Sequence, residues 1–179
     1  MVLRLAVGLV VAVVAAGAQA APYDPVVAKA EVERVLSRDL PRLVAIYRDI
    51  HQHPELAFQE KATAAKLARE MRAAGLTVTE GVGGTGVVAV LKNGPGPTVL
   101  VRTELDALPM AERTGLPYAS RAVTTWQGRE TPVAHSCGHD IHMAAWVGAA
   151  RALAALKDAW SGTLIFIGQP AEETTSGAQ

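Results

Sequence analysis

Apolar residues recur at helical spacing in three stretches of the chain. The first covers residues 26–52, where the spacing predicts one helix or a pair of helices, with Pro41 in the first turn of the second segment and Pro54 beyond its end. A second helix is predicted over 59–74, followed by Gly75 as a C-terminal stop. The Ala-rich stretch 141–157 is apolar on more than one side, which predicts a well-buried third helix.

Shorter apolar runs between these helices predict strands at 86–91 and 98–102, with a short one at 76–80. Residues 162–168 form a continuous apolar run, which is typical of a central strand covered on both faces. Residues 110–136 are polar and carry little periodicity, so we expect a long functional loop there. Helices that alternate with buried strands predict an α/β fold with helices on both faces of a mixed sheet.

The N-terminus has the composition of an export signal. Arg4 precedes an unbroken apolar run over residues 5–16, and Ala18 and Ala20 place small residues before a cleavage point. The run is shorter than the roughly 20 residues of a membrane span, which makes an N-terminal anchor helix the weaker alternative. We therefore expect residues 1–20 to be a signal peptide, residues 21–179 to form the folded part, and the protein to be periplasmic or secreted, without a membrane attachment after cleavage.

Charge and cysteine content limit the classes of partner that the chain could bind. The 17 Lys and Arg residues balance the 17 Asp and Glu residues, and no basic block occurs, so nothing indicates a nucleic-acid partner. Cys137 is the single cysteine, so an exported chain cannot form an internal disulfide. Its thiol must be free, paired with another chain or bound to a metal, and an oxidising compartment favours the metal.

Polar residues follow three of the predicted elements. Strand 98–102 leads into Glu104 and Asp106, loop 110–136 leads into Cys137 and His139, and strand 162–168 leads into Glu172 and Glu173. In open α/β sheets, ligands bind beyond the carboxyl ends of the strands. If these segments are neighbours, a thiol, an imidazole and several carboxylates converge, which is costly without cations. The pattern favours a hydrolytic metal centre over solvated loop charges.

Other interpretations of the same residues remain open at this point. Cys137 and His139 could act as the nucleophile and base of a cysteine hydrolase, although tandem glutamates have no role in such an enzyme. A secreted metal-binding protein without catalysis is a further alternative. His51 and His53 are interpreted as structural or capping residues, and His135 and His142 either orient ligands or are simply hydrogen-bonded.

Four ordered motifs carry a family resemblance: Ile50-His51-Gln52-His53-Pro54-Glu55-Leu56, Glu104-Leu105-Asp106-Ala107-Leu108-Pro109, Cys137-Gly138-His139-Asp140 and Pro170-Ala171-Glu172-Glu173. From about residue 41 onward the chain resembles peptidase family M20, specifically its amidohydrolase branch of hippurate hydrolases, indole-3-acetyl-amino-acid hydrolases and N-acyl-L-amino acid amidohydrolases. One strand end departs from the branch, which usually reads Ala-Asp-x-Asp where this chain has Thr103-Glu104-Leu105-Asp106.

The resemblance implies an aminoacylase-like catalytic domain that binds two divalent ions (Zn, Mn, Co or Ni), with a smaller lid domain. It implies that Cys137, His139 and Glu173 are metal ligands, that Glu172 is the general base, and that Asp106 is an acidic residue that orients a ligand. The substrate would be an N-acyl amino acid or small peptide, and the full-length protein could be a homodimer or larger oligomer. Further ligands and the lid would lie beyond residue 179, so we expect these residues to be an N-terminal fragment, inactive alone.

The residues themselves suggest the same chemistry. A divalent metal would activate a water molecule, and Glu172 would take its proton and pass it to the leaving amine. An extended chain at Glu172-Glu173 would point the two side chains in opposite directions, so that one is the base and the other a ligand.

Overall fold

A computed structural model describes residues 24–179, so the predicted signal peptide at 1–20 lies outside the described residues. The elements, in chain order, are α1 (Pro25–Gln52), α2 (Lys61–Ala73), β1 (Thr77–Val82), β2 (Gly86–Asn93), β3 (Thr98–Glu104), β4 (Val123–Trp126), β5 (Arg129–Pro132), α3 (His139–Ala155), a 3₁₀ turn (Lys157–Ala159) and β6 (Gly162–Gln169). Within this part of the chain, no helix is both long enough and apolar enough to cross a membrane.

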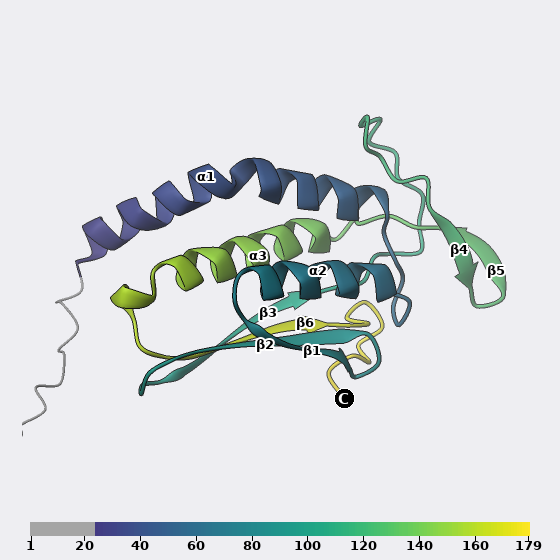
Figure 1. The fold of residues 1–179 in the computed structure, drawn as a ribbon. Coiled ribbons are helices and arrows are strands. Elements are labelled where there is room, and N and C mark those ends of the chain that lie inside the picture. The colour runs from purple at the N-terminus through teal and green to yellow at the C-terminus, as the bar shows by residue number, and fades with distance from the viewer. Residues whose placement is uncertain (1–23) are drawn as a thin grey trace, which may run out of the picture.

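The main sheet has the strand order β1-β2-β6-β3 and mixes both pairing directions (Figure 1). β1 pairs antiparallel with β2, β2 antiparallel with β6, and β3 parallel with β6. The predicted strands and the mixed α/β class are confirmed. β6 lies inside the sheet, as its apolar sequence predicted. In its parallel pairing with β3, Gln169 of β6 lies level with Glu104 of β3.

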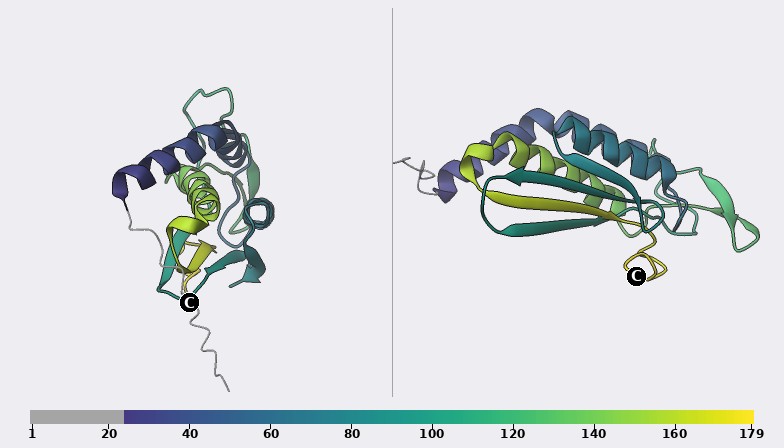
Figure 2. Two further views of the ribbon diagram at one scale, coloured as in Figure 1. Left: turned by 60° about the vertical axis from the view of Figure 1, so that its left-hand side comes forward. Right: turned by 60° about the horizontal axis from the view of Figure 1, so that its bottom comes forward.

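The helices form two layers on one side of this sheet (Figures 1 and 2). α2 and α3 lie against the strands, and α1 packs on α3. The core between the helices and the sheet contains Leu67, Met71, Trp146 and Phe166. The rings of Trp146 and Phe166 meet edge to face. Alternate burial along β6 follows from this arrangement: Leu164 and the other residues toward the helices are buried, while those of the opposite face are half-buried.

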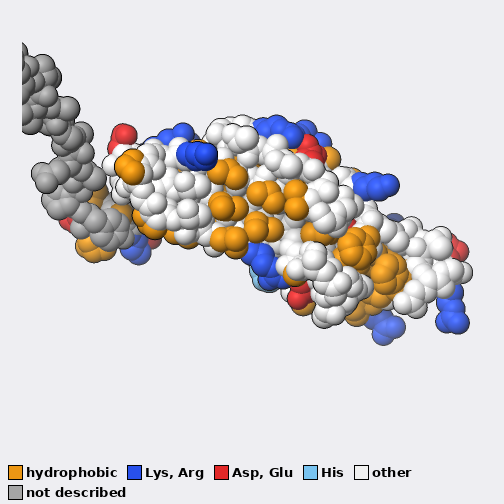
Figure 3. Space-filling view, turned by 90° about the horizontal axis from the view of Figure 1, so that it is seen from below, with side chains coloured by type: hydrophobic (Ala, Val, Ile, Leu, Met, Phe, Trp, Pro, Cys, Tyr) orange, Lys and Arg blue, Asp and Glu red, His pale blue; other side chains and the backbone are white. Residues whose placement is uncertain are grey.

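The expectation of helices on both faces is therefore met on one face only in residues 24–179. The opposite face carries half-buried or exposed apolar side chains from three strands: Val88, Val90, Leu100, Ile165 and Ile167. Seen from that side, hydrophobic atoms gather over the middle of the sheet (Figure 3). The continuous apolar run of β6 thus places apolar side chains on both faces of the sheet, although the described elements cover only one of these faces.

α1 is a single helix rather than a pair, with Pro41 inside it. Asp24 caps its N-terminus through a hydrogen bond from the Val26 amide at 2.8 Å. Proline in a helix interior removes one hydrogen bond and is costly. Burial of Val35, Ile46 and other residues of the apolar stripe against α3 keeps the helix continuous across this position.

The segment 110–136 is not all loop, because it contains a β-hairpin of β4 and β5. Gln127 and Gly128 form its two-residue turn, and both have positive φ, 50° and 75°. This is the turn geometry that matches the twist of a hairpin. The signal was missed because Gln-Gly is a weaker turn sequence than Asn-Gly, and because the flanking strands are mostly polar and exposed.

Candidate metal centre and active site

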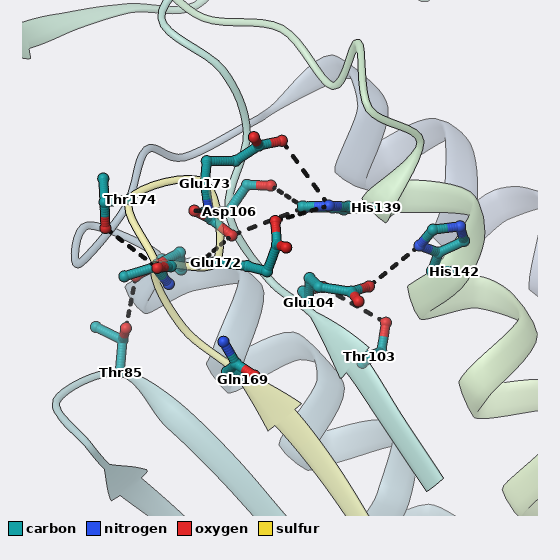
Figure 4. Close-up of polar contacts among 12 residues, drawn as sticks. Thr85, Thr103, Glu104, Asp106, His139, His142, Gln169, Glu172, Glu173 and Thr174 are labelled. Atoms are coloured by element: carbon teal, nitrogen blue, oxygen red, sulfur yellow. Dashed lines mark hydrogen bonds and ion pairs between the residues drawn. The ribbon is translucent and has the colours of Figure 1, made fainter. Parts of the chain in front are cut away.

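The predicted site residues meet at the carboxyl edge of the sheet. β3 and β6 run parallel and end level with each other, so the segments after them emerge side by side. The first carries Asp106, and the second carries Glu172 and Glu173. The N-terminus of α3 lies at the same edge and supplies His139 (Figure 4).

A glycine turn brings Cys137 and His139 to one place. Gly138 has a φ of +83° and immediately precedes α3, which begins at His139, two residues before the predicted start. A left-handed conformation costs little at glycine, which explains the Cys-Gly-His sequence at this sharp entry into a helix. Sγ of Cys137, a ring nitrogen of His139 and a carboxylate oxygen of Glu173 all lie within 4.8 Å of one another.

Hydrogen bonding fixes the orientation of the buried His139 ring. Its Nδ1 lies 2.8 Å from the backbone carbonyl oxygen of Asp106. A carbonyl only accepts, so Nδ1 is the donor in this contact, which leaves Nε2 as the nitrogen that can ligate a metal. Nε2 is 3.6 Å from a carboxylate oxygen of Glu172 and 3.8 Å from one of Glu173. The ring therefore presents its ligating nitrogen to both glutamates.

Asp106 is completely buried and contacts both halves of the site. Its carboxylate accepts the backbone N–H of Glu172 at 3.1 Å and that of Glu173 at 2.9 Å, while its carbonyl accepts from His139. One residue therefore connects the end of β3 to the start of α3 and to the turn after β6. Asp106 therefore orients the His139 ring directly and the two glutamates through their backbone amides.

The turn after β6 differs from the extended chain expected at Glu172-Glu173. Ala171 has a φ of +51°, and residues 172–175 form a turn closed by the Thr175 amide on the Glu172 carbonyl. The two carboxylates consequently point to the same side, toward His139, instead of to opposite sides (Figure 4). The prediction of opposite directions was wrong because it assumed strand geometry beyond Gln169.

The donor set fits a divalent cation. Among the described residues, Oε1 of Glu173 is buried without a hydrogen-bond partner and lies 3.8 Å from Nε2 of His139. One oxygen of the same carboxylate lies within 4.8 Å of the Cys137 thiol. An orphaned buried carboxylate oxygen is costly, and a cation would satisfy it. Thiolate, imidazole and carboxylate are also the ligands that zinc and related metals take in proteins.

The same surroundings argue against Cys137 as a nucleophile. Loss of solvation by the atoms packed around it, followed by the negative charge of Glu173, a hydrogen bond to that carboxylate and the charge of Glu172, raises the pKa of the Cys137 thiol. Reactive cysteines need a depressed pKa instead, which neighbouring cations provide. A bound cation would reverse this effect, so the thiol is better suited to be a ligand.

Glu104 and His142 form a second group beside the first. Oε2 of Glu104 lies 3.1 Å from Nδ1 of His142, and Oε1 accepts from Arg102 at 2.7 Å. These two residues and His139 are also close enough to surround a cation. Because Nδ1 of His139 is occupied by Asp106, its one free nitrogen can serve only one ion at a time.

The remaining histidines have different surroundings. His53 is the C-cap of α1, as predicted, and its Nδ1 lies 2.8 Å from the Asp49 carbonyl. His51 is buried between Asp140 at 2.6 Å and Glu112 at 3.1 Å. Burial opposes charge on His51, but hydrogen bonds to both carboxylates outweigh it and raise its pKa. Within residues 24–179, His135 has no hydrogen-bond partner at either ring nitrogen, contrary to expectation, and burial lowers its pKa to about 4.

Two polar residues next to the site were missed at the sequence level. Glu112 joins the 110–136 segment to His51, and the fully buried Glu60 accepts the Ala171 amide at 2.8 Å. Neither position carries a pattern that distinguishes it from a solvated charge.

Comparison with known proteins places these residues in a family. Residues 100–179 match the sequence profile of Peptidase family M20/M25/M40, which includes Asp106, Cys137, His139 and both glutamates. The chain is 39% identical over 140 residues to N-acetylcysteine deacetylase of Bacillus subtilis, covering 77% of this chain and 35% of that protein. It is 40% identical over 135 residues to hippurate hydrolase of Campylobacter jejuni, covering 75% of this chain and 33% of that enzyme.

A solved structure agrees with these sequence matches. The YXEP protein of Bacillus subtilis, described as a dinuclear metal-binding peptidase of the M20 family, superposes with a TM-score of 0.69 at 36% identity. The match covers 84% of this chain and 38% of that one. The chain thus spans about a third of the length of the relatives it matches. On its sequence, its fold and the arrangement of these motifs, the chain belongs to peptidase family M20.

Proposed function

We propose that the full-length protein is a metal-dependent amidohydrolase that cleaves the amide bond of an N-acyl amino acid or a small peptide. The observation that carries this proposal is the cluster of Cys137, His139 and Glu173, in which Oε1 of Glu173 is buried and has no hydrogen-bond partner in the described part of the chain. The carboxylate of Glu172 lies on the same side. The relatives named for N-acetylcysteine deacetylation and hippurate hydrolysis support this substrate class.

Cys137, His139 and Glu173 would hold one divalent cation, and the dinuclear relative supports a second one in the full-length protein. When bound, the metal supplies Lewis acidity, which polarises the scissile carbonyl and makes water acidic near neutral pH. The choice among zinc, manganese, cobalt and nickel is open to a reconstitution series with each metal in turn.

Glu172 is suited to the role of general base. Its side chain is 37% exposed and can meet substrate and water, whereas that of Glu173 is 18% exposed and faces the ligand cluster. In the proposed reaction, Glu172 takes a proton from the attacking water and delivers it to the leaving amine nitrogen as the C–N bond breaks. Asp106 holds the backbone of both glutamates and the ring of His139 in place.

The test is Glu172→Gln in the full-length protein, measured on a panel of N-acyl amino acids and by metal analysis. The variant should lose hydrolysis by at least about 100-fold, since general-base catalysis contributes about 10²–10⁴, and it should keep its metal. Glu130→Gln, an exposed change on β5, is the matched control. Full activity in Glu172→Gln would refute the mechanism, and an inactive wild type that still binds metal would instead indicate a binding protein without catalysis.

A second test concerns Cys137. Chelation should abolish activity reversibly, and restored metal should protect the exposed thiol from alkylation. Chelator-resistant hydrolysis with an acyl-cysteine intermediate would support the cysteine-hydrolase alternative instead.

The place of action that we propose, the periplasm or the exterior of the cell, rests on the sequence of residues 1–20. Fusion of these residues to a reporter that is active only after export tests this proposal directly.

A further inference from the structure

Glu60, a buried carboxylate outside the proposed ligand set, contacts the segment that leads into the turn at residues 172–175. Glu60 immediately precedes α2 and is 0% exposed. Its Oε1 accepts the Ala171 amide at 2.8 Å, and its Oε2 accepts the Thr85 hydroxyl at 2.5 Å. Burial raises the pKa of this carboxyl. Burying such a group is costly unless its hydrogen bonds compensate, so its contact with the turn needs an explanation.

Ala171 is the residue at which the chain changes direction. It is completely buried, and its φ of +51° lies in a region that alanine rarely adopts. Contacts on both sides hold it there. Its amide donates to Glu60, and its carbonyl accepts from the Thr174 hydroxyl at 3.1 Å and from the Ser176 amide at 3.3 Å. A non-glycine residue keeps such a conformation only where its surroundings over-determine it.

The direction of both active-site glutamates depends on this residue. Glu60 accepts the N–H of Ala171, and Asp106 accepts the next two, those of Glu172 and Glu173. Two carboxylates from distant elements therefore hold three consecutive amides of the turn. If Ala171 relaxed to an extended conformation, the two glutamates would point to opposite sides, and they could not both face His139.

We propose that Glu60 is a positioning residue for the reaction, which holds Ala171 in its left-handed conformation and thereby directs Glu172 toward substrate and Glu173 toward the metal. This inference rests on the proposed function for its catalytic part only. Its metal-binding part concerns the position of Glu173 and can be measured without a substrate.

The experiment uses four variants of the full-length protein. Glu60→Met keeps the side-chain length but removes the acceptor, and Glu60→Asp keeps the charge but is one methylene too short to reach the Ala171 amide. Glu60→Gln retains an oxygen at the same reach, and its amide nitrogen can donate to Thr85. Lys61→Ala, an exposed change at the neighbouring position, is the control. For each variant we would measure cobalt(II) affinity from its visible absorption, then kcat and KM, and finally the thermal midpoint.

Both Glu60→Met and Glu60→Asp should weaken cobalt affinity and lower kcat by about 10- to 100-fold, the range for residues that orient metal ligands, with KM within about threefold. Glu60→Gln should retain both quantities within about threefold, as should the control. A purely structural role would lower the thermal midpoint without this separation of kcat from KM and without rescue by glutamine. Even if Glu60→Met does not fold, Glu60→Asp still provides the comparison with Glu60→Gln.

Two results would overturn the proposal: cobalt affinity and kcat within twofold of wild type in a folded Glu60→Met or Glu60→Asp variant, or a loss in Glu60→Gln as large as in those two. A wild type that hydrolyses no N-acyl amino acid or peptide would refute the proposed function alone, because the cobalt measurements would still decide whether Glu60 positions Glu173.

Discussion

Asp106→Asn is the most informative single substitution in this chain, because it removes one acceptor and leaves the shape unchanged. The aspartate oxygens accept from two backbone amides, at 3.1 Å and 2.9 Å. Asparagine has only one oxygen, so its NH₂ group must face the amide of either Glu172 or Glu173. A hydrogen bond to a charged group contributes about 1.5–3 kcal/mol. The backbone amide that faces the NH₂ group, which is half-buried, then also lacks a partner, so we expect a total loss of about 3 kcal/mol.

That loss corresponds to a factor of about 100 in an equilibrium constant. Denaturant unfolding of the metal-free full-length protein would measure the part that falls on stability, and cobalt(II) titration the part that falls on the metal site. Glu130→Gln, on the exposed β5 strand, should change the free energy of unfolding by less than about 0.5 kcal/mol. A folded Asp106→Asn protein with the stability of that control and unchanged cobalt affinity would show that the carboxylate does not hold the turn.

Three further predictions concern stability and solubility. Hydrogen bonds from two arginines hold the pKa of Asp39 well below its usual range. The stabilisation of the fold by the ionised Asp39 is therefore present above about pH 4 and lost as the pH falls further. Asp39→Asn should flatten the acid limb of a plot of unfolding free energy against pH. For His51, whose pKa is raised by its hydrogen bonds to Asp140 and Glu112, the contribution of the protonated ring to stability is complete below about pH 6.5 and lost as the pH rises through the higher folded pKa. His51→Phe should remove that alkaline loss and cost about 3 kcal/mol at pH 6, because it takes the imidazolium from between two buried carboxylates. Residues 21–179 expressed alone should bind an apolar dye and self-associate through the open sheet face, and Ile165→Lys should reduce both signals in light scattering and fluorescence; an unaltered monomeric preparation would contradict this.

The elements that could be predicted from sequence are those whose signal is local. Alternating apolar residues in β2 and the helical stripe of α2 need no distant partner to be recognised, and both were predicted within a few residues. The position of α3 was also predicted, although its true start at His139 depends on the Gly138 turn. The convergence of three segments at one sheet edge followed from a general rule of α/β sheets, and the structure brings them together.

What could not be predicted depends on contacts between distant segments. The Ala171 amide donates to Glu60, which lies 111 positions earlier, so nothing around residue 171 indicates this contact or the left-handed conformation that accompanies it. The one-sided cover of the sheet has a similar origin, because an apolar run shows that both faces of β6 avoid water but not which residues cover them. The β4–β5 hairpin was missed for a local reason, its weak turn signal at Gln127.

The strand order also constrains how the protein can be made. β1 and β2 are neighbours in sequence and can pair as soon as they are synthesised, but β6, which pairs with β2 and β3, is the last in sequence of the strands that the structure describes in this sheet. Until about residue 169 has left the ribosome, β3 lacks the β6 partner that it has in the described part of the chain, and the core under α3 cannot close. Pairings of this range are slow and leave strand edges exposed to other chains meanwhile. The described part of the sheet therefore stays open until β6 has been synthesised, and Cys137 and His139 meet Glu173 only after that strand has emerged.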